Sequence, residues 1–208
     1  MENIFEKYAN RTPSIIDEEK FKKYAVFLPL IKKEEDYHIL FEIRAYHMRR
    51  QPGEICFPGG KIDKSDIDPK YTAYRETFEE LGIQQNDITH IFPLDYMMNS
   101  FGTMIYPFAG IIKNEERILP NPAEVAKVFT VPLSFFKNTE PECYKINFKV
   151  EPEKNFPFHS ITGGENYNWQ IRHMDEYFYY YKDYTIWGLT AYILKNFIEI
   201  IKKENLKM

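Results

Sequence analysis

The sequence predicts a single α/β domain, and three observations support this. Apolar or alternating segments typical of β-strands recur along the chain, and two segments have the periodicity or end signals of helices. No repeat, low-complexity tract or Gly/Ser linker interrupts the 208 residues. We therefore expect one domain that spans residues 1–208.

Five segments have the pattern of strands. Residues 24–31 form a mostly apolar run that suits a buried strand, and residues 39–45 alternate between apolar and more polar side chains. The clearest period of two lies in residues 143–150. The remaining candidates are residues 104–112 and 126–131.

Two helices are expected, and one has both of its ends marked. Asp68 is a favourable N-cap, Pro69 suits the first helical position, and Gly82 suits a left-handed C-terminal cap. These signals predict a helix over residues 69–81. The second helix, at about residues 186–206, has apolar residues three and four apart and should pack on the sheet.

One side of the helix at 69–81 carries Glu76, Glu79 and Glu80, because a helix turns by about 100° per residue. We expect this acidic side to be presented to solvent. The opposite side, which we expect to be buried, carries Tyr71, Tyr74, Phe78 and Leu81. Clustered carboxylates raise one another's pKa unless a cation is present, and oxygen ligands suit magnesium or manganese. Taken alone, however, such a cluster is more often an ordinary solvated surface.

The loop before this helix favours a site over a plain surface. Phe57-Pro58-Gly59-Gly60 ends a candidate strand with two residues that lack a Cβ, so the backbone can approach a ligand or ion closely. A carbonyl near Gly60 is therefore a candidate metal ligand.

The loop and helix at about residues 59–83 resemble the signature of the Nudix hydrolase family. That signature is a glycine, a spacer, and then Arg-Glu-apolar-any-Glu-Glu-any-Gly-apolar. Here its second half reads RETFEELGI from Arg75, and it departs only at Thr77, where an aliphatic residue is usual. The spacer after Gly60 is one residue longer than the general signature, and Asp66 stands near the place of a family glutamate. The longer spacer is similar to that of the coenzyme A pyrophosphatase subgroup.

An upstream pattern also resembles that subgroup. Arg44, Arg49, Gly53 and the FPGG segment at residues 57–60 keep its spacing, although Phe41-Glu42 replaces the usual Leu-Thr. Similar segments further along the chain are residues 121–125, 131–133 and 186–191.

The resemblance implies a Nudix-type α/β/α sandwich with a mixed β-sheet. It also implies a pyrophosphohydrolase that uses Mg2+ or Mn2+ to draw charge from a diphosphate and to lower the pKa of the attacking water. The implied substrate is coenzyme A or acyl-coenzyme A, cleaved to 3′,5′-ADP and 4′-phosphopantetheine or its acyl form. Two alternatives stay open: another substrate such as ADP-ribose or a dinucleotide, and a non-catalytic nucleotide-sensing domain.

The resemblance further implies roles for five charged residues. Glu76, Glu79 and Glu80 would be metal ligands, together with the backbone of the glycine turn. Arg75 would orient these glutamates through charge-assisted hydrogen bonds. Glu124 is either an extra ligand or base, or a structural partner of Arg75 or of a backbone amide.

The substrate-binding residues are expected in the upstream pattern. Arg44 and Arg49 suit phosphate, because a guanidinium donates two parallel hydrogen bonds to phosphate oxygens; exposed strand-edge arginines are the alternative. The other residues assigned to this set are Gly53, Phe57, Gly59 and Gly60.

Two further groups have mainly structural interpretations. Asp63, Asp66 and Asp68 suit turns and helix capping. The aromatic segment at residues 156–181 is either a lid or wall against an adenine or pantetheine group, or part of the core, and core packing is the stronger expectation.

Composition bounds the remaining properties. A net charge of −4 argues against a broad nucleic-acid surface, which needs clustered Lys and Arg, and favours a small-molecule substrate. The N-terminus lacks signal-peptide features and no apolar run is long enough for a bilayer, so we expect a cytoplasmic protein without a membrane partner. Cys56 and Cys143 lie far apart and are interpreted as reduced and structural. Oligomerisation stays open.

Overall fold

The computed structural model describes residues 2–99, 101–170 and 172–205. Its helices are α1 (Glu2–Tyr8), α2 (Pro69–Leu81), α3 (Leu133–Asn138) and α4 (Gly188–Asn205). Short 3-10 helices are η1 (Glu18–Lys20), η2 (Gln85–Asp87), η3 (Glu115–Arg117), η4 (Phe158–Ser160) and η5 (Gly164–Asn166). Its strands are β1 (Lys22–Lys33), β2 (Asp36–Arg44), β3 (Ile55–Cys56), β4 (Gly59–Lys61), β5 (Ile88–Pro93), β6 (Met97–Asn99), β7 (Thr103–Ile112), β8 (Val125–Pro132), β9 (Glu142–Phe148), β10 (Arg172–Tyr181) and β11 (Tyr184–Trp187).

The central sheet is mixed, as predicted. Its strand order is β3-β2-β1-β7-β5, with β4 paired to β1, β6 to β7 and β8 to β2. Strands β1 and β7 run parallel, and the other pairs are antiparallel. A separate three-stranded sheet has the order β11-β10-β9. Each of the five segments expected as strands is mostly or wholly contained in a strand, namely β1, β2, β7, β8 or β9.

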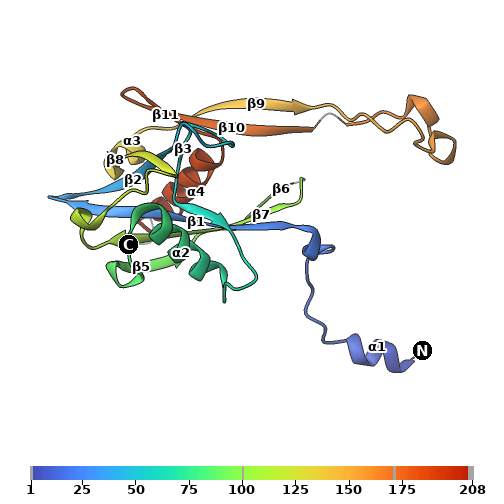
Figure 1. The fold of residues 1–208 in the computed structure, drawn as a ribbon. Coiled ribbons are helices and arrows are strands. Elements are labelled where there is room, and N and C mark those ends of the chain that lie inside the picture. Colours follow the sequence, from blue (N-terminus) through green and yellow to red (C-terminus); the bar gives the residue numbers. More distant parts are fainter. Residues whose placement is uncertain (1, 100, 171, 206–208) are drawn as a thin grey trace.

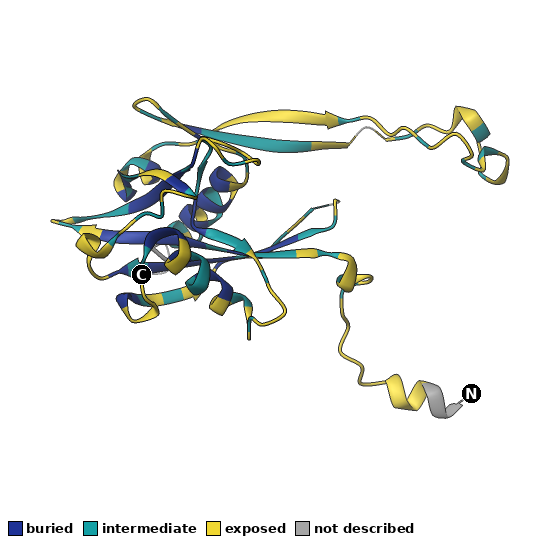
Figure 2. Ribbon diagram, in the orientation of Figure 1, coloured by how far each residue is buried: buried dark blue, intermediate teal, exposed yellow. Residues whose placement is uncertain are grey.

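Helices cover both faces of the central sheet, which confirms the α/β/α sandwich (Figure 1). On one face, α2 packs over β1 and β7 around a core cluster that includes Phe27, Leu40 and Leu81. On the other face, α4 lies between the central sheet and strands β10 and β11. Figure 2 shows that buried residues concentrate where these layers meet.

Strand β1 changes partner along its length, and this places the glycine turn. Its second half pairs with β2 through residues 30–33, whereas residues 24–26 pair with β4. Where the partner changes, the Phe27 N–H donates to the Pro58 carbonyl at 2.8 Å. A Cβ on Gly59 would lie 2.5 Å from the Ala25 carbonyl oxygen, so only glycine fits this close approach.

Helix α2 begins and ends as the sequence predicts. The Asp68 carboxylate accepts a hydrogen bond from the Tyr71 N–H at 2.7 Å, with Pro69 next in the first turn. At the other end, Gly82 has φ 69° and its N–H donates to the Phe78 carbonyl.

The expected burial of α2 is wrong in part. Tyr71 and Phe78 are 41% and 48% exposed, whereas Glu80 is only 3% exposed. The buried residues of the helix are Thr72, Ala73, Thr77, Glu80 and Leu81. Small side chains on this side let the helix backbone lie close to the sheet, and the larger aromatic side chains remain outside. Glu80 is consequently carried into the interface between helix and sheet.

One expectation for the last third of the chain needs correction. Helix α4 begins at Gly188, because Ile186 and Trp187 belong to β11; its expected last residue, Leu206, lies outside the described residues. Strand β9 forms as predicted and is exposed along most of its length.

The aromatic segment at 156–181 divides into two parts. Tyr179 on β10 is buried against α3 and α4, which agrees with core packing. By contrast, Phe156, Phe158, Tyr167 and Trp169 pack on one another in the loop between β9 and β10. This loop projects well away from the central sheet (Figure 1).

Candidate active site

The glycine turn and the acidic helix meet as the sequence suggests. The Gly59 N–H donates to the Glu80 Oε2 at 2.9 Å. A Cβ on Gly60 would overlap the Glu76 carboxylate, so the two groups lie in direct contact. Backbone of the turn and carboxylates of α2 therefore form one surface.

Arg75 connects the acidic helix to the loop before it. Its Nη1 donates to Glu76 Oε1 at 2.8 Å and to Glu79 Oε2 at 3.2 Å. Its Nε and Nη2 donate to the two oxygens of Asp66 at 3.1 and 3.0 Å, and Nη2 also reaches the Lys61 carbonyl at 3.2 Å. The guanidinium therefore holds two of the three helix glutamates in place.

Asp66 has the structural role expected of the loop aspartates. Besides Arg75, its Oδ2 accepts from the Asp63 N–H at 2.9 Å and from the Thr72 hydroxyl at 2.8 Å. The Arg75 guanidinium, with these donors, holds the pKa of Asp66 well below its usual range.

Electrostatics within the site favour a bound cation. Burial raises the pKa of Glu80, and the neighbouring Glu42 carboxylate raises it further. Burial also raises the pKa of Glu76, although its hydrogen bond to Arg75 acts in the opposite direction. Repulsion from the neighbouring Glu124 carboxylate also raises the pKa of both Glu76 and Glu80. Accumulated negative charge of this kind is relieved by a divalent cation.

The donor set suits a hard divalent cation, because it consists of carboxylate oxygens beside backbone carbonyls. Within the described residues, no three acidic, His or Cys side chains already form a ready-made group of metal ligands. Glu76 and Glu79 are instead engaged by Arg75, and Glu80 by the Gly59 amide. Coordination would thus require these carboxylates to turn from their present donors to the ion.

A cleft of about 710 Å³ opens beside the glycine turn. Arg44, Phe57, Gly59 and Gly60, all assigned to substrate binding from the sequence, line it. Its apolar walls include Met97, Phe101, Met174, Trp187, Leu189 and Tyr192, from β6, the following loop, β10, β11 and α4. The glutamates of α2 do not themselves line the cleft, but Gly60 belongs to the cleft and also contacts Glu76.

Arg49 and Gly53 are placed differently from the other expected substrate residues, since neither lines the cleft. Arg50 lines it instead. Gly53 has φ 73° and its N–H donates to the Arg44 carbonyl at 3.1 Å, so it closes the turn that carries Arg50. In an irregular loop, sequence spacing alone does not show which side chains face the cleft.

Glu124 lies next to the start of β8 and is partly buried. Its N–H donates to the Asn121 carbonyl at 3.0 Å, and its carbonyl accepts from the Ala45 N–H at 2.7 Å. The backbone of Glu124 is therefore fixed beside β2, close to Arg44.

Sequence reasoning placed neither Glu42 nor Cys56 in the functional site and interpreted Cys56 as structural. Glu42 is 1% exposed on β2, and Cys56, opposite it on β3, donates its thiol hydrogen to Glu42 Oε1 at 3.4 Å. The available signal was the acidic residue at an alternating position of a strand expected to be buried.

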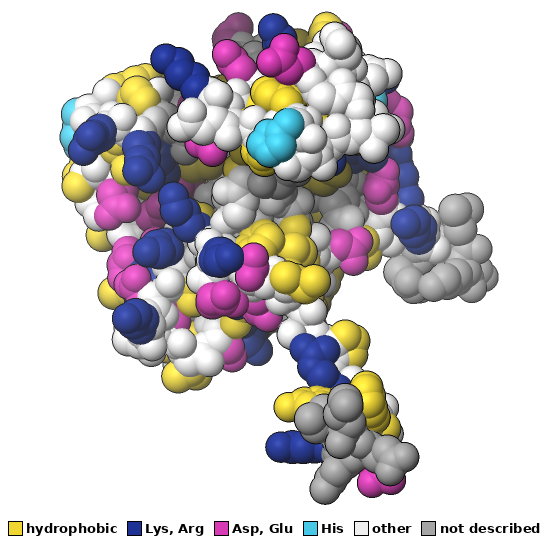
Figure 3. Space-filling view, turned by 90° about the vertical axis from the view of Figure 1, so that its right-hand side faces the viewer, with side chains coloured by type: hydrophobic (Ala, Val, Ile, Leu, Met, Phe, Trp, Pro, Cys, Tyr) yellow, Lys and Arg dark blue, Asp and Glu magenta, His cyan; other side chains and the backbone are white. Residues whose placement is uncertain are grey.

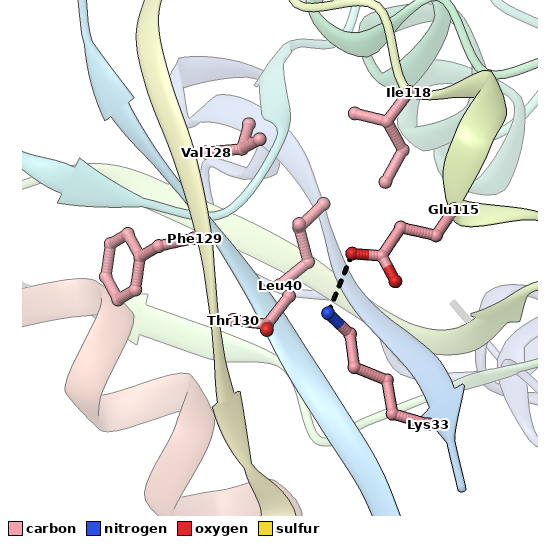
Figure 4. Close-up of a pocket in the computed structure, with 7 residues that line it drawn as sticks. All are labelled: Lys33, Leu40, Glu115, Ile118, Val128, Phe129 and Thr130. Atoms are coloured by element: carbon pink, nitrogen blue, oxygen red, sulfur yellow. Dashed lines mark hydrogen bonds and ion pairs between the residues drawn. The ribbon is translucent and has the colours of Figure 1, made fainter.

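A second hollow, of about 360 Å³, lies elsewhere and contains none of the expected site residues. Figure 4 shows it beside the ion pair of Lys33 and Glu115, whose Nζ and Oε1 are 2.7 Å apart. On the face shown in Figure 3, basic and acidic side chains are interspersed. Because the second hollow contains none of the expected site residues, the cleft at the glycine turn remains the candidate active site.

The fold and site define an α/β/α protein with a carboxylate-rich helix packed against a glycine turn. A family model described as the NUDIX domain matches residues 22–146, which is more than half of the chain. The chain therefore belongs to the Nudix family. Nudix hydrolases generally use divalent metal ions, in agreement with the donor set.

Individual relatives agree with this assignment. The chain is 32% identical over 140 residues to "Peroxisomal coenzyme A diphosphatase NUDT7" of Mus musculus, covering 66% of this chain and 57% of the relative. It is 31% identical over 181 residues to "Nudix hydrolase 15, mitochondrial" of Arabidopsis thaliana, covering 86% of this chain and 58% of the relative. The chain thus spans a little over half the length of these two relatives.

A solved structure shows the same fold. A MutT/nudix family protein from Enterococcus faecalis has a TM-score of 0.53 at 15% identity, covering 97% of this chain and 69% of the other. Within the described part of the chain, no helix is both long and apolar enough to cross a bilayer. Cytoplasmic location and the lack of nucleic-acid or membrane partners stay predictions.

Proposed function

We propose that the chain is a divalent-metal-dependent diphosphatase that acts on coenzyme A or acyl-coenzyme A. The observation that carries this proposal is the contact of Gly60 with Glu76 at the edge of a cleft lined by Arg44 and Arg50. Guanidinium groups suited to phosphate and carboxylates suited to a metal ion would then act on either side of the glycine turn. Water would add to one phosphorus of the diphosphate while the bridging P–O bond breaks, giving 3′,5′-ADP and 4′-phosphopantetheine or its acyl form.

The metal ligands, Arg75 and the glycine turn would each have a separate role. A divalent cation bound by Glu76, Glu79, Glu80 and the Gly60 carbonyl would offset diphosphate charge and acidify water. Arg75 holds Glu76 and Glu79 by the hydrogen bonds described above. Absence of side chains at the glycine turn lets the diphosphate approach the backbone.

The remaining charged residues act on the substrate or on the proton. Arg44 and Arg50 would donate to phosphate oxygens from the cleft wall. Glu124, whose backbone is fixed beside the end of β2, would accept a proton or add a ligand.

The preference for coenzyme A rests on the cleft and on the resemblance. A volume of about 710 Å³ accommodates more than a diphosphate, and its long apolar wall suits a pantetheine chain. The upstream pattern of the coenzyme A subgroup and the name of the Mus musculus relative favour the same substrate. ADP-ribose or a dinucleotide is the second candidate, because the same metal site would serve it.

A product assay tests the proposal. The full chain is incubated with coenzyme A, acetyl-coenzyme A, ADP-ribose and a diadenosine polyphosphate, each with Mg2+ or Mn2+. We expect 3′,5′-ADP from the first two at the highest kcat/KM. Cleavage of ADP-ribose alone would remove the preferred substrate, and binding without cleavage of any compound would favour a nucleotide sensor.

A further inference from the structure

Glu42 is a buried carboxylate with an unused oxygen. It is 1% exposed, and although Cys56 donates to its Oε1 at 3.4 Å, its Oε2 has no hydrogen-bond partner among the described residues. Burial of an ionised carboxylate is costly unless it is paired with a cation or with donors. Structural packing alone therefore gives no account of this residue.

The alternation of β2 shows which layer Glu42 belongs to. Leu40, two residues earlier, packs in the core cluster beneath α2, whereas Ile39 and Phe41 pack in the cluster on the α4 side. Since every second side chain of a strand lies on the same face, Glu42 lies on the α2 side. Glu80 enters that interface from the helix.

Other residues around Glu42 connect it to the candidate site. Cys56, which contacts its carboxylate, lines the cleft and directly precedes the FPGG segment. Arg44 follows Glu42 by two residues at the end of β2, where the pairing with β8 shifts register, and within the described residues it forms no ion pair with Glu42. Glu80 accepts a hydrogen bond from the Gly59 N–H, only three residues after the Cys56 that contacts Glu42, so both buried carboxylates adjoin the same short segment.

We propose that Glu42 is a further ligand of the divalent-metal site, supplied from the sheet beneath α2. This inference rests on the proposed metal-dependent function. It concerns this chain in particular, since the subgroup that the sequence resembles usually has threonine at this position. A cation bound between Glu42 and Glu80 would neutralise two buried carboxylates at once, and the unused Oε2 would acquire a partner.

A structural role for Glu42 makes a different prediction for metal binding. If the Cys56 hydrogen bond were its purpose, Glu42→Gln would keep Mn2+ affinity, because the amide oxygen can still accept from the thiol. If Glu42 is a ligand, removing its charge leaves the metal-free fold unchanged or more stable, because an uncompensated buried charge is lost. Only stabilisation by added metal should then decrease.

The test compares Glu42→Gln with wild type in the full chain without substrate. Mn2+ binding is measured by calorimetry, and Tm is measured with and without Mn2+. We expect Glu42→Gln to bind at least about tenfold more weakly or to take up fewer ions. We also expect its metal-free Tm to equal or exceed that of wild type.

A control variant separates loss of this charge from loss of a charge elsewhere. Glu35→Gln removes a carboxylate from the exposed turn before β2 and should keep the Mn2+ affinity of wild type within about twofold. Glu42→Asp, which keeps the charge on a shorter side chain, should lie between wild type and Glu42→Gln.

Several outcomes would overturn the inference. Unchanged Mn2+ affinity and stoichiometry in Glu42→Gln would do so, and so would a metal-free Glu42→Gln that unfolds or melts lower. No Mn2+ uptake by wild type would remove both this inference and the metal-dependent function. If Glu42→Gln binds Mn2+ weakly but wild type cleaves no diphosphate, the ligand assignment stands and the proposed reaction fails.

Discussion

The guanidinium of Arg75 and the carboxylate of Asp66 form a two-bond ion pair, with Nε to Oδ1 at 3.1 Å and Nη2 to Oδ2 at 3.0 Å. The same guanidinium uses its third nitrogen to hold Glu76 and Glu79. Asp66 consequently sets the orientation of Arg75, and through it the orientation of two glutamates of the candidate metal site.

Asp66→Asn should therefore lower the metal affinity of the site, although Asp66 is not itself a proposed ligand. A neutral amide cannot accept both guanidinium N–H groups and also offer charge, so Arg75 and its two glutamates lose their fixed geometry. We expect Mn2+ affinity to fall about tenfold or more. Calorimetric titration checks this, and Asp63→Asn, which changes an exposed neighbour, is the matched control.

The ion pair of Arg75 and Asp66 predicts that the stability of the fold depends on pH. Because Arg75 and the other donors depress the pKa of Asp66, the folded state binds its proton less readily than the unfolded state. The stabilisation is present above the unfolded pKa of about 4 and is lost as pH falls through the lower folded pKa. Urea unfolding between pH 7 and pH 2 should show a shallower acid loss in Asp66→Asn than in wild type.

Glu79 and Glu80 should respond differently to loss of charge. Glu79 is 47% exposed, so Glu79→Gln should fold as wild type. Glu80 is buried, and Glu80→Gln should keep the metal-free Tm near that of wild type, because burial raises the pKa of Glu80 and favours a neutral side chain, which the amide resembles. In both variants we expect kcat to fall at least about 100-fold, corresponding to loss of roughly 3 kcal/mol of transition-state stabilisation. Near-wild-type turnover of either variant would contradict its assignment as a ligand.

Gly59 and Gly60 form a second contrasting pair. In Gly59→Ala the new Cβ meets the backbone of β1, which cannot move aside, and we expect destabilisation of about 1–3 kcal/mol in urea unfolding. In Gly60→Ala the Cβ meets the end of the Glu76 side chain, which can rotate away. Gly60→Ala should thus stay folded but lose metal affinity and turnover. Equal behaviour of the two variants would argue against this arrangement of the turn.

Arg50 and Arg49 test the cleft as the substrate site. Arg50 lines the cleft and its neighbour does not. For a diphosphate substrate, Arg50→Ala should raise KM by about tenfold through loss of a charge-assisted contact, whereas Arg49→Ala should change KM by less than about twofold. Steady-state kinetics on the substrate identified by the product assay measure both. A larger effect at Arg49 would restore the assignment made from sequence spacing.

The sequence alone determined the ends of helix α2, since Asp68, Pro69 and Gly82 act through local backbone geometry. It also determined five of the strand segments and the family, because their signals are periodic or contiguous in the chain. Burial of Glu80, the choice of Arg50 over Arg49 and the contact between Glu42 and Cys56 were decided only by the tertiary structure. Each depends on how closely separate elements approach, and that distance is set by side chains from several strands and helices together.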